Sequence, residues 1–272
     1  MKLLALDMDG TCLNSYSKIS QKTMDALHLA RTSGIEIVPT TGRALSCIPH
    51  QLRKTGLFRY VISSNGAVAV DLKEQKTLFC ALMPSEAATT IIESCQGPDL
   101  KMAAHIHHDY LLQGQLLPFF GHLIYGRDAS QTKAVPDLAE FIRSRHADVE
   151  ELQFFLLTKK ARERTRRIVS EFPELSSAHT SYYAEIYSSN ATKGTALSAV
   201  ADYLSVSKDE IACIGDGEND ITMFQASGLR FAMGNAVSDL KSMADVVVSS
   251  NNHDGVAEAV RYLISAVPPA EF

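Results

Sequence analysis

Residues 2–11 read KLLALDMDGT, and this stretch decides the fold class. Residues 2–6 are apolar after the lysine, which is typical of a strand in a parallel sheet that is covered on both faces. Asp7 and Asp9 follow where this strand ends, and residues i and i+2 of an extended chain point to the same side. Ligands of doubly wound sheets bind beyond the carboxyl ends of the strands. The two carboxylates are therefore predicted to face a binding site, and Gly10 allows a sharp turn beside it.

The two ends of the chain alternate strands with helices, which predicts an α/β fold with a doubly wound, Rossmann-like parallel sheet. The first predicted helix begins after Ser20, a good N-cap residue, and stops at Gly34. The Asn65-Gly66 pair between apolar runs predicts a turn. The predicted strands cover residues 2–6, 35–38, 60–63, 211–214, 229–233 and 245–248. The later helices are expected over residues 195–204, 220–226, 238–244 and 255–264.

The middle of the chain has a less regular pattern, with an amphipathic helix at residues 85–95. This predicts a smaller α/β domain inserted into the core. The expected division is a core made of residues 1–82 and 188–272 and an inserted domain over residues 83–187. The basic run at residues 159–167 lacks interleaved aromatic residues and is interpreted as the solvated surface of a helix.

Composition excludes several classes of protein. The 272 residues are 46% hydrophobic and carry 26 basic and 31 acidic side chains, a net charge of −5. Neither a disordered nor a fibrous chain has this balance, and a mildly acidic protein has no global attraction to nucleic acid or anionic lipid. No apolar run reaches the roughly 20 residues that cross a bilayer. We therefore expect no nucleic acid or membrane partner and a cytoplasmic location.

The five cysteines are scattered and form no CxxC pair. Neither a disulfide framework nor a thiolate zinc site is indicated, and we expect these side chains to be buried as small apolar groups.

A second acidic cluster, GDGEND at residues 215–220, also follows a predicted buried strand and opens a helix. It superficially matches a glycine-rich dinucleotide loop, but the carboxylates of Asp216, Glu218 and Asp220 would repel a pyrophosphate. Two acidic clusters at strand ends instead suit a hard divalent cation.

Two further segments supply groups that bind an anion. The segment PTTGR at residues 39–43 ends the second predicted strand, and the Thr41 hydroxyl and the Gly42 amide are suited to a phosphate. Lys193 precedes a predicted helix, so its ammonium lies near the positive end of the helix dipole. Each signal is weak by itself, but their combination at strand ends indicates phosphate chemistry.

These four segments, in this order and spacing, resemble the motifs of the haloacid dehalogenase superfamily. They are Asp7–Thr11, Thr41–Arg43, Lys193-Gly194 and Gly215–Asp220. The accessory segments Asn65-Gly66-Ala67 and Met233-Gly234-Asn235-Ala236 resemble those of its Cof-type phosphatases, class IIB. The resemblance implies that residues 83–187 form the α/β cap (C2 cap) of that class, which closes over the site and selects the leaving group.

The resemblance also implies roles for the catalytic residues. Asp7 would be the nucleophile that forms an aspartyl-phosphate, and Asp9 would be the acid for the leaving alcohol and then the base for water. Lys193 would neutralise charge between the nucleophile and the phosphate. This agrees with the chemistry, since phosphoryl transfer needs placement and positive charge around the phosphoryl oxygens.

The same resemblance implies the groups that bind phosphate and metal. The phosphoryl oxygens would be held by Thr41, Gly42, the backbone amides of Met8 and Asp9, Lys193 and Asn219. The expected cofactor is Mg²⁺, bound by Asp7, the carbonyl of Asp9 and Asp216, with Asp220 behind them. Arg43 belongs to its motif but is given no catalytic role.

The predicted function is a magnesium-dependent phosphatase acting on a small phosphorylated metabolite, a sugar phosphate or pyridoxal phosphate. A phosphotransferase or phosphomutase with the same nucleophile is one alternative, and a phosphoacceptor receiver-like protein is another. The polar cap residues His107, His108, Tyr182, Tyr183 and Glu185 are candidates for substrate contact. Substrate identity and oligomeric state are left open by the sequence.

Overall fold

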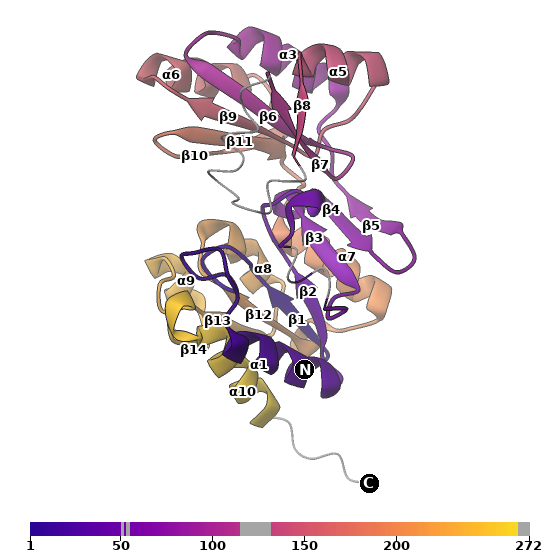
Figure 1. The fold of residues 1–272 in the computed structure, drawn as a ribbon, viewed down its shortest axis with the longest axis vertical. Helices are drawn as coiled ribbons and strands as arrows, with labels where there is room; N and C mark the ends of the chain where they lie inside the picture. Colours follow the sequence, from indigo (N-terminus) through magenta and orange to yellow (C-terminus); the bar gives the residue numbers. More distant parts are fainter. Residues whose placement is uncertain (50–51, 53–54, 115–131, 266–272) are drawn as a thin grey trace. The chain divides into compact units, whose positions relative to one another are not determined.

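The chain divides into two compact units in the computed structural model, which describes residues 1–49, 52, 55–114 and 132–265 (Figure 1). The first unit comprises Met1–Gly42, Pro49–Cys80 and Thr192–Phe272, and the second comprises Arg43–Ile48 and Ala81–Ala191. The second unit thus contains the predicted insertion. It also takes in residues 43–48, which the sequence analysis placed with the core.

The first unit is built on a five-stranded parallel sheet with the order β14-β13-β12-β1-β2. The strands are β1 (Leu3–Leu6), β2 (Glu36–Pro39), β12 (Ile211–Gly215), β13 (Leu229–Ala232) and β14 (Val246–Val247). The predicted α/β fold is confirmed, and β1 lies at its centre with every residue buried. Because β1 lies between β12 and β2, the loops that follow these three strands emerge side by side at one edge.

Four of the five helices described in this unit pack in two pairs. The helices are α1 (Gln21–Thr32), α7 (Lys193–Leu204), α8 (Ile221–Gln225), α9 (Ser238–Met243) and α10 (Gly255–Ser265). Helix α1 packs against α10, and α7 packs against α8 (Figure 1). The Ser20 hydroxyl caps α1 by accepting the Thr23 amide, as predicted.

The third predicted strand is β3 (Tyr60–Ser63), but it belongs to a separate antiparallel sheet with β4 (Val68–Asp71) and β5 (Lys76–Cys80). The predicted turn at Asn65-Gly66 explains this, since it returns the chain beside β3. One parallel bridge, between Thr40 and Ile62, connects β3 to the end of β2.

The second unit has a six-stranded sheet with the order β10-β11-β9-β6-β7-β8, antiparallel except for the last pair. The strands are β6 (Leu100–Ile106), β7 (Asp109–Gln113), β8 (Lys133–Val135), β9 (Glu151–Leu156), β10 (Leu175–His179) and β11 (Tyr183–Ser188). The helices are α3 (Ser85–Cys95), α5 (Leu138–Arg145) and α6 (Lys159–Val169). Alternate residues of β6, such as Met102 and Ala104, point into the core of this unit.

The other face of this sheet carries the segment Arg43–Ile48. The Ser46 amide donates to the His108 carbonyl at 2.9 Å. Ala44 and Cys47 pack in a small apolar cluster with Ala103, Tyr110 and Leu112. The chain therefore enters the second unit directly after Gly42, within the motif predicted to bind phosphate.

Four of the five cysteines are buried as predicted, but Cys80 is exposed, which corrects the expectation for that residue. Cys80 ends β5, an outer strand of its sheet, so it is less covered than a residue of a central strand. The basic run lies on α6, where both Arg166 and Arg167 are exposed. None of the helices in the described part of the chain has the length and apolar character to cross a bilayer.

His105 on β6 is fully buried against the Tyr110 ring, and burial lowers its pKa to about 4, against an opposing effect of Glu150. Its native pKa is below its unfolded value, so it stabilises the fold at neutral pH. This stabilisation is lost as the pH falls from about 6.5 toward 4, by roughly 1.4 kcal/mol per pH unit. In His105→Gln, we expect the free energy of unfolding to lose this part of its pH dependence in denaturant titrations.

The exposed His28 of α1 offers a matched control, since His28→Gln is expected to retain the slope of the unsubstituted chain. Equal slopes for His105→Gln and the unsubstituted chain would contradict the prediction.

Candidate active site

Asp7 lies directly after β1, at the carboxyl edge of the parallel sheet. Its amide donates to the Ile214 carbonyl of β12 at 3.1 Å, which aligns it with the end of that strand. Its side chain is buried, with 5% of the residue exposed. The Asp7 carboxylate therefore lies beside the loop that follows β12, which carries the second acidic cluster.

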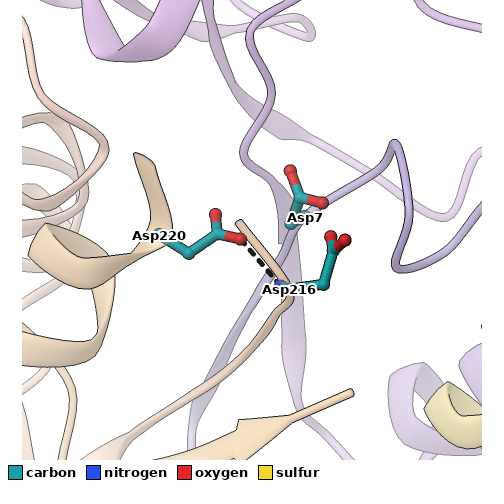
Figure 2. A group of neighbouring side chains, drawn as sticks. All are labelled: Asp7, Asp216 and Asp220. Atoms are coloured by element: carbon teal, nitrogen blue, oxygen red, sulfur yellow. Dashed lines mark hydrogen bonds between the residues drawn. The ribbon is translucent and has the colours of Figure 1, made fainter. Parts of the chain in front are cut away.

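Asp7, Asp216 and Asp220 form one group of carboxylates (Figure 2). Each offers an oxygen, and these oxygens lie within 4.8 Å of one another. Residues more than two hundred positions apart in the sequence thus meet because β1 and β12 are neighbours in the sheet. Oxygen ligands at this spacing are what a hard divalent cation prefers.

Lys193 connects two members of the group. Its Nζ lies 2.6 Å from Asp7 Oδ1 and 2.6 Å from Asp220 Oδ1, and its side chain has no exposed surface. Lys193 is the first residue of α7, which the Thr192 hydroxyl caps by accepting the Thr195 amide. The ammonium thus reaches the carboxylates from the start of a helix. The helix begins two residues before the predicted position.

Asp220 has no oxygen left without a protein partner. Its Oδ1 accepts a hydrogen bond from Lys193, and its Oδ2 accepts the Gly217 amide at 3.0 Å. The same Oδ2 accepts the Asp216 amide at 2.9 Å (Figure 2). The helix predicted over residues 220–226 is confirmed as α8, and a short 3-10 turn, Glu218–Asp220, precedes it. This turn directs the Asp220 carboxylate back onto the preceding loop, so Asp220 supports the acidic cluster.

Asp7 differs from Asp220 in this respect. Asp7 Oδ2 is buried and has no hydrogen-bond partner among the described residues. A buried anionic oxygen without a partner is costly, so this atom is suited to a cation or to a reacting group. The acidic cluster therefore has the donor atoms that a Mg²⁺ ion requires, including one oxygen without another partner in the described part of the chain.

Burial and mutual repulsion shift the pKa values of the cluster. Burial is the largest cause that raises the pKa of Asp7, and the Asp220 charge adds to it. Burial likewise raises the pKa of Asp216, although the hydrogen bond from Thr11 opposes it. For Lys193, burial opposes the charge, but Asp220 and Asp7 together raise its pKa above the usual value. The lysine is therefore an ammonium at neutral pH.

Asp9 has a different environment from Asp7, because it is exposed while Asp7 is buried. The chain leaves the strand after Leu6 and turns, so the alternation of an extended strand does not extend to these two residues. The structure does not bring Asp9 into the carboxylate group described above.

Apart from Lys193, the residues predicted to bind phosphate lie on the three neighbouring segments that follow β1, β2 and β12. The Thr41 amide donates to the Ile62 carbonyl at 2.9 Å, which holds the segment Thr41-Gly42 beside the end of β3. A Cβ on Gly42 would lie 2.9 Å from Asn65 Oδ1, so glycine permits the close approach of these loops. Asn219 Nδ2 donates to Asn65 Oδ1 at 2.9 Å. Met8 is buried in the turn that follows Asp7.

Two residues of this site were given no role in the sequence analysis. Asn65 fixes the Asn219 amide, and the Thr11 hydroxyl donates to Asp216 Oδ1 at 2.8 Å. Both residues lie within the segments that resemble family motifs, and no other feature of the sequence indicates a role for them. Arg43 is also buried, and it donates to the Cys47 carbonyl within the second unit.

The candidate cap residues lie in the second unit. His107 and His108 form the tight turn between β6 and β7, both with positive φ, and His108 binds Glu150. Tyr183 and Glu185 lie on β11, and Tyr182 just before it is 79% exposed. Their contact with a substrate stays a prediction.

Comparisons with known proteins agree with this geometry. A family model described as haloacid dehalogenase-like hydrolase matches residues 4–260. Phosphatase YwpJ of Bacillus subtilis is 30% identical over 97% of this chain and 100% of its own length. A solved haloacid dehalogenase-like hydrolase from B. subtilis has a TM-score of 0.83 at 28% identity, covering 97% of this chain and 100% of its own.

A third relative shares the fold at lower identity. The solved structure of the HAD subclass IIB sugar phosphatase BT4131 has a TM-score of 0.81 at 21% identity, covering 97% of this chain and 99% of its own. The predicted enzyme class, a phosphoric monoester hydrolase, is confirmed by these matches. The chain belongs to the haloacid dehalogenase-like hydrolase family, as a Cof-type member with the subclass IIB fold.

Proposed function

We propose that this chain hydrolyses a small phosphorylated metabolite, a sugar phosphate or pyridoxal phosphate, through a phosphoryl group carried on Asp7. The observation that carries the proposal is the environment of the two Asp7 carboxylate oxygens. One oxygen is held at 2.6 Å by the buried Lys193 ammonium, and the other is buried without a hydrogen-bond partner among the described residues. A carboxylate held in this way is positioned to act as a nucleophile.

Mg²⁺ is the proposed cofactor. With all groups ionised, the three carboxylates and Lys193 leave two negative charges uncompensated, which matches one divalent cation. Asp7, Asp216 and the Asp9 carbonyl would hold it, with Asp220 supporting them. When bound, Mg²⁺ supplies positive charge for the phosphoryl oxygens.

In the first proposed step, an Asp7 oxygen forms a bond to phosphorus while the bond from phosphorus to the leaving oxygen breaks. Asp9 donates a proton to that oxygen, which leaves as an alcohol. The exposed position of Asp9 supports this role, since an exposed carboxyl can reach a leaving group and exchange its proton with water.

In the second step, Asp9 accepts a proton from water, whose oxygen attacks phosphorus. The bond to Asp7 breaks, and inorganic phosphate is released. The Thr41 hydroxyl, the Gly42 amide and the backbone amides of Met8 and Asp9 would hold the phosphoryl oxygens. The Asn219 amide, oriented by Asn65, would donate to them as well.

The nucleophile is tested by Asp7→Asn, assayed for phosphate release from a panel of sugar phosphates and pyridoxal phosphate with Mg²⁺. We expect kcat to fall at least about a thousandfold, because an amide is not a nucleophile of this kind. Asp202→Asn, at an exposed position of α7, is the matched control and should retain full activity.

Full activity in Asp7→Asn would refute the proposed nucleophile. A labelled substrate separates the alternatives, because label on a second sugar hydroxyl would identify a phosphotransferase or phosphomutase. Stoichiometric labelling of the protein without turnover would favour a receiver-like protein.

The metal site is tested by thermal unfolding with and without Mg²⁺. Mg²⁺ at about 100 times its Kd should stabilise the protein by about 2.7 kcal/mol. The pKa values of Asp7 and Asp216 are raised in the folded protein. Protonation of these carboxylates therefore stabilises the fold at low pH, and this contribution is lost as the pH rises through their native pKa values. The Mg²⁺-induced rise in Tm should therefore be larger at pH 8 than at pH 5 and absent in Asp216→Asn. An equal rise in Asp216→Asn would place the metal elsewhere.

The buried ion pairs of Lys193 are tested by Lys193→Met. Removal of the ammonium leaves Asp7 and Asp220 buried and facing each other, so the free energy of unfolding should fall by about 3–5 kcal/mol. Lys208→Met, at an exposed position, is the control. Denaturant titration in chelator measures both, and equal stability of the two variants would show that the ion pairs contribute nothing.

A further inference from the structure

The Asp216 carboxylate is held from both sides by neutral groups. The Thr11 hydroxyl donates to Oδ1 at 2.8 Å, and Asn235 Nδ2 lies 3.2 Å from Oδ2. A cation in place of Asn235 would cancel the charge that a divalent ion requires. An amide instead orients the carboxylate and leaves its charge in place.

Asn235 also holds two other loops. Its Nδ2 donates to the Gly10 carbonyl at 2.8 Å, and its Oδ1 accepts the Asn251 amide at 2.9 Å. Gly10 has a φ of +82°, and a Cβ there would lie 2.2 Å from Asp216 Oδ2. Asn235 thus fixes the distance between the loop that carries Asp7 and the loop that carries Asp216, at a place where the backbone packs tightly.

The backbone around Asn235 is anchored to the end of β12. The Met233 amide donates to the Gly215 carbonyl at 3.0 Å, and the Val237 amide donates to the Asp216 carbonyl at 3.0 Å. The segment between them is therefore tied on both sides to the strand end that carries Asp216. The position of the Asn235 side chain is determined by this backbone, although the residue itself is exposed.

We infer that Asn235 is a positioning residue, which orients the Asp216 carboxylate and keeps the Gly10 loop beside it so that Asp216 and Asp7 face the same cation. This inference rests on the proposed function, which places Mg²⁺ at these carboxylates. Asn235 would act through Asp216, without contact to the phosphate or to the nucleophile.

The test measures the Kd of Mg²⁺ by calorimetry on the full chain without substrate, so that it does not depend on turnover. We expect Asn235→Ala to bind Mg²⁺ about 10–100-fold more weakly, the usual effect of removing a group that orients a metal ligand. Asn252→Ala is the matched control. The Asn252 side chain makes two hydrogen bonds with Ser15 and also connects two loops. Removal of this side chain should leave the Mg²⁺ Kd unchanged.

Asn235→Ser repeats the test with a smaller disturbance of the loop, and its side chain is too short to bridge the same groups. It should weaken Mg²⁺ binding like Asn235→Ala, while both variants keep a Tm close to that of Asn252→Ala. A Kd within twofold of the unsubstituted chain for both Asn235 variants, or equal weakening in Asn252→Ala, overturns the inference.

Asp216→Asn separates this inference from the proposed function. If Asp216→Asn loses Mg²⁺ binding while the Asn235 variants keep it, the positioning role fails and the metal site stands. If Asp216→Asn binds Mg²⁺ as the unsubstituted chain does, the proposed metal site fails, and the positioning role fails with it.

Discussion

The site depends on one buried ammonium between two buried carboxylates. Lys193 lies 2.6 Å from both Asp7 and Asp220, and none of the three side chains has more than a few per cent of its surface exposed. Burial raises the pKa of Asp7, and the Lys193 charge opposes that rise. Lys193 thus favours the ionised form of Asp7, which is the form that a carboxylate nucleophile requires.

That interaction exists because of the order of strands in the parallel sheet. β1 lies between β2 and β12, so the loops that carry Asp7, Thr41 and Asp216 leave the sheet at the same edge. Helix α7 brings Lys193 to that edge, and its capped start fixes where the side chain begins. The sheet therefore assembles the charges. Hydrogen bonds that Thr11 and Asn235 donate orient Asp216, and the hydrogen bond that Asn65 accepts orients Asn219.

The second unit is joined to this site through the chain itself. The chain passes from the first unit to the second between Gly42 and Arg43, within the segment proposed to bind phosphate. The following residues are held by the second unit, through the Ser46 amide and the packing of Cys47. Gly42, which is proposed to bind phosphate together with Thr41, is thus joined by one peptide bond to a segment that belongs to the other unit.

The sequence by itself determined the strands of the parallel sheet and the helices around them, and it indicated phosphate chemistry. Continuous apolar runs predicted the buried strands, Ser20 predicted the start of α1, and the acidic motifs predicted a cation site. These signals are local, and burial periodicity and capping depend on neighbouring residues. Only the tertiary structure decided that Asp9 is exposed while Asp7 is buried, that β3 joins an antiparallel sheet, and that residues 43–48 belong to the second unit. It also decided which side chains hold Asp216, because hydrogen bonds between residues 11, 216 and 235 depend on strand order and loop packing, and no local pattern encodes either.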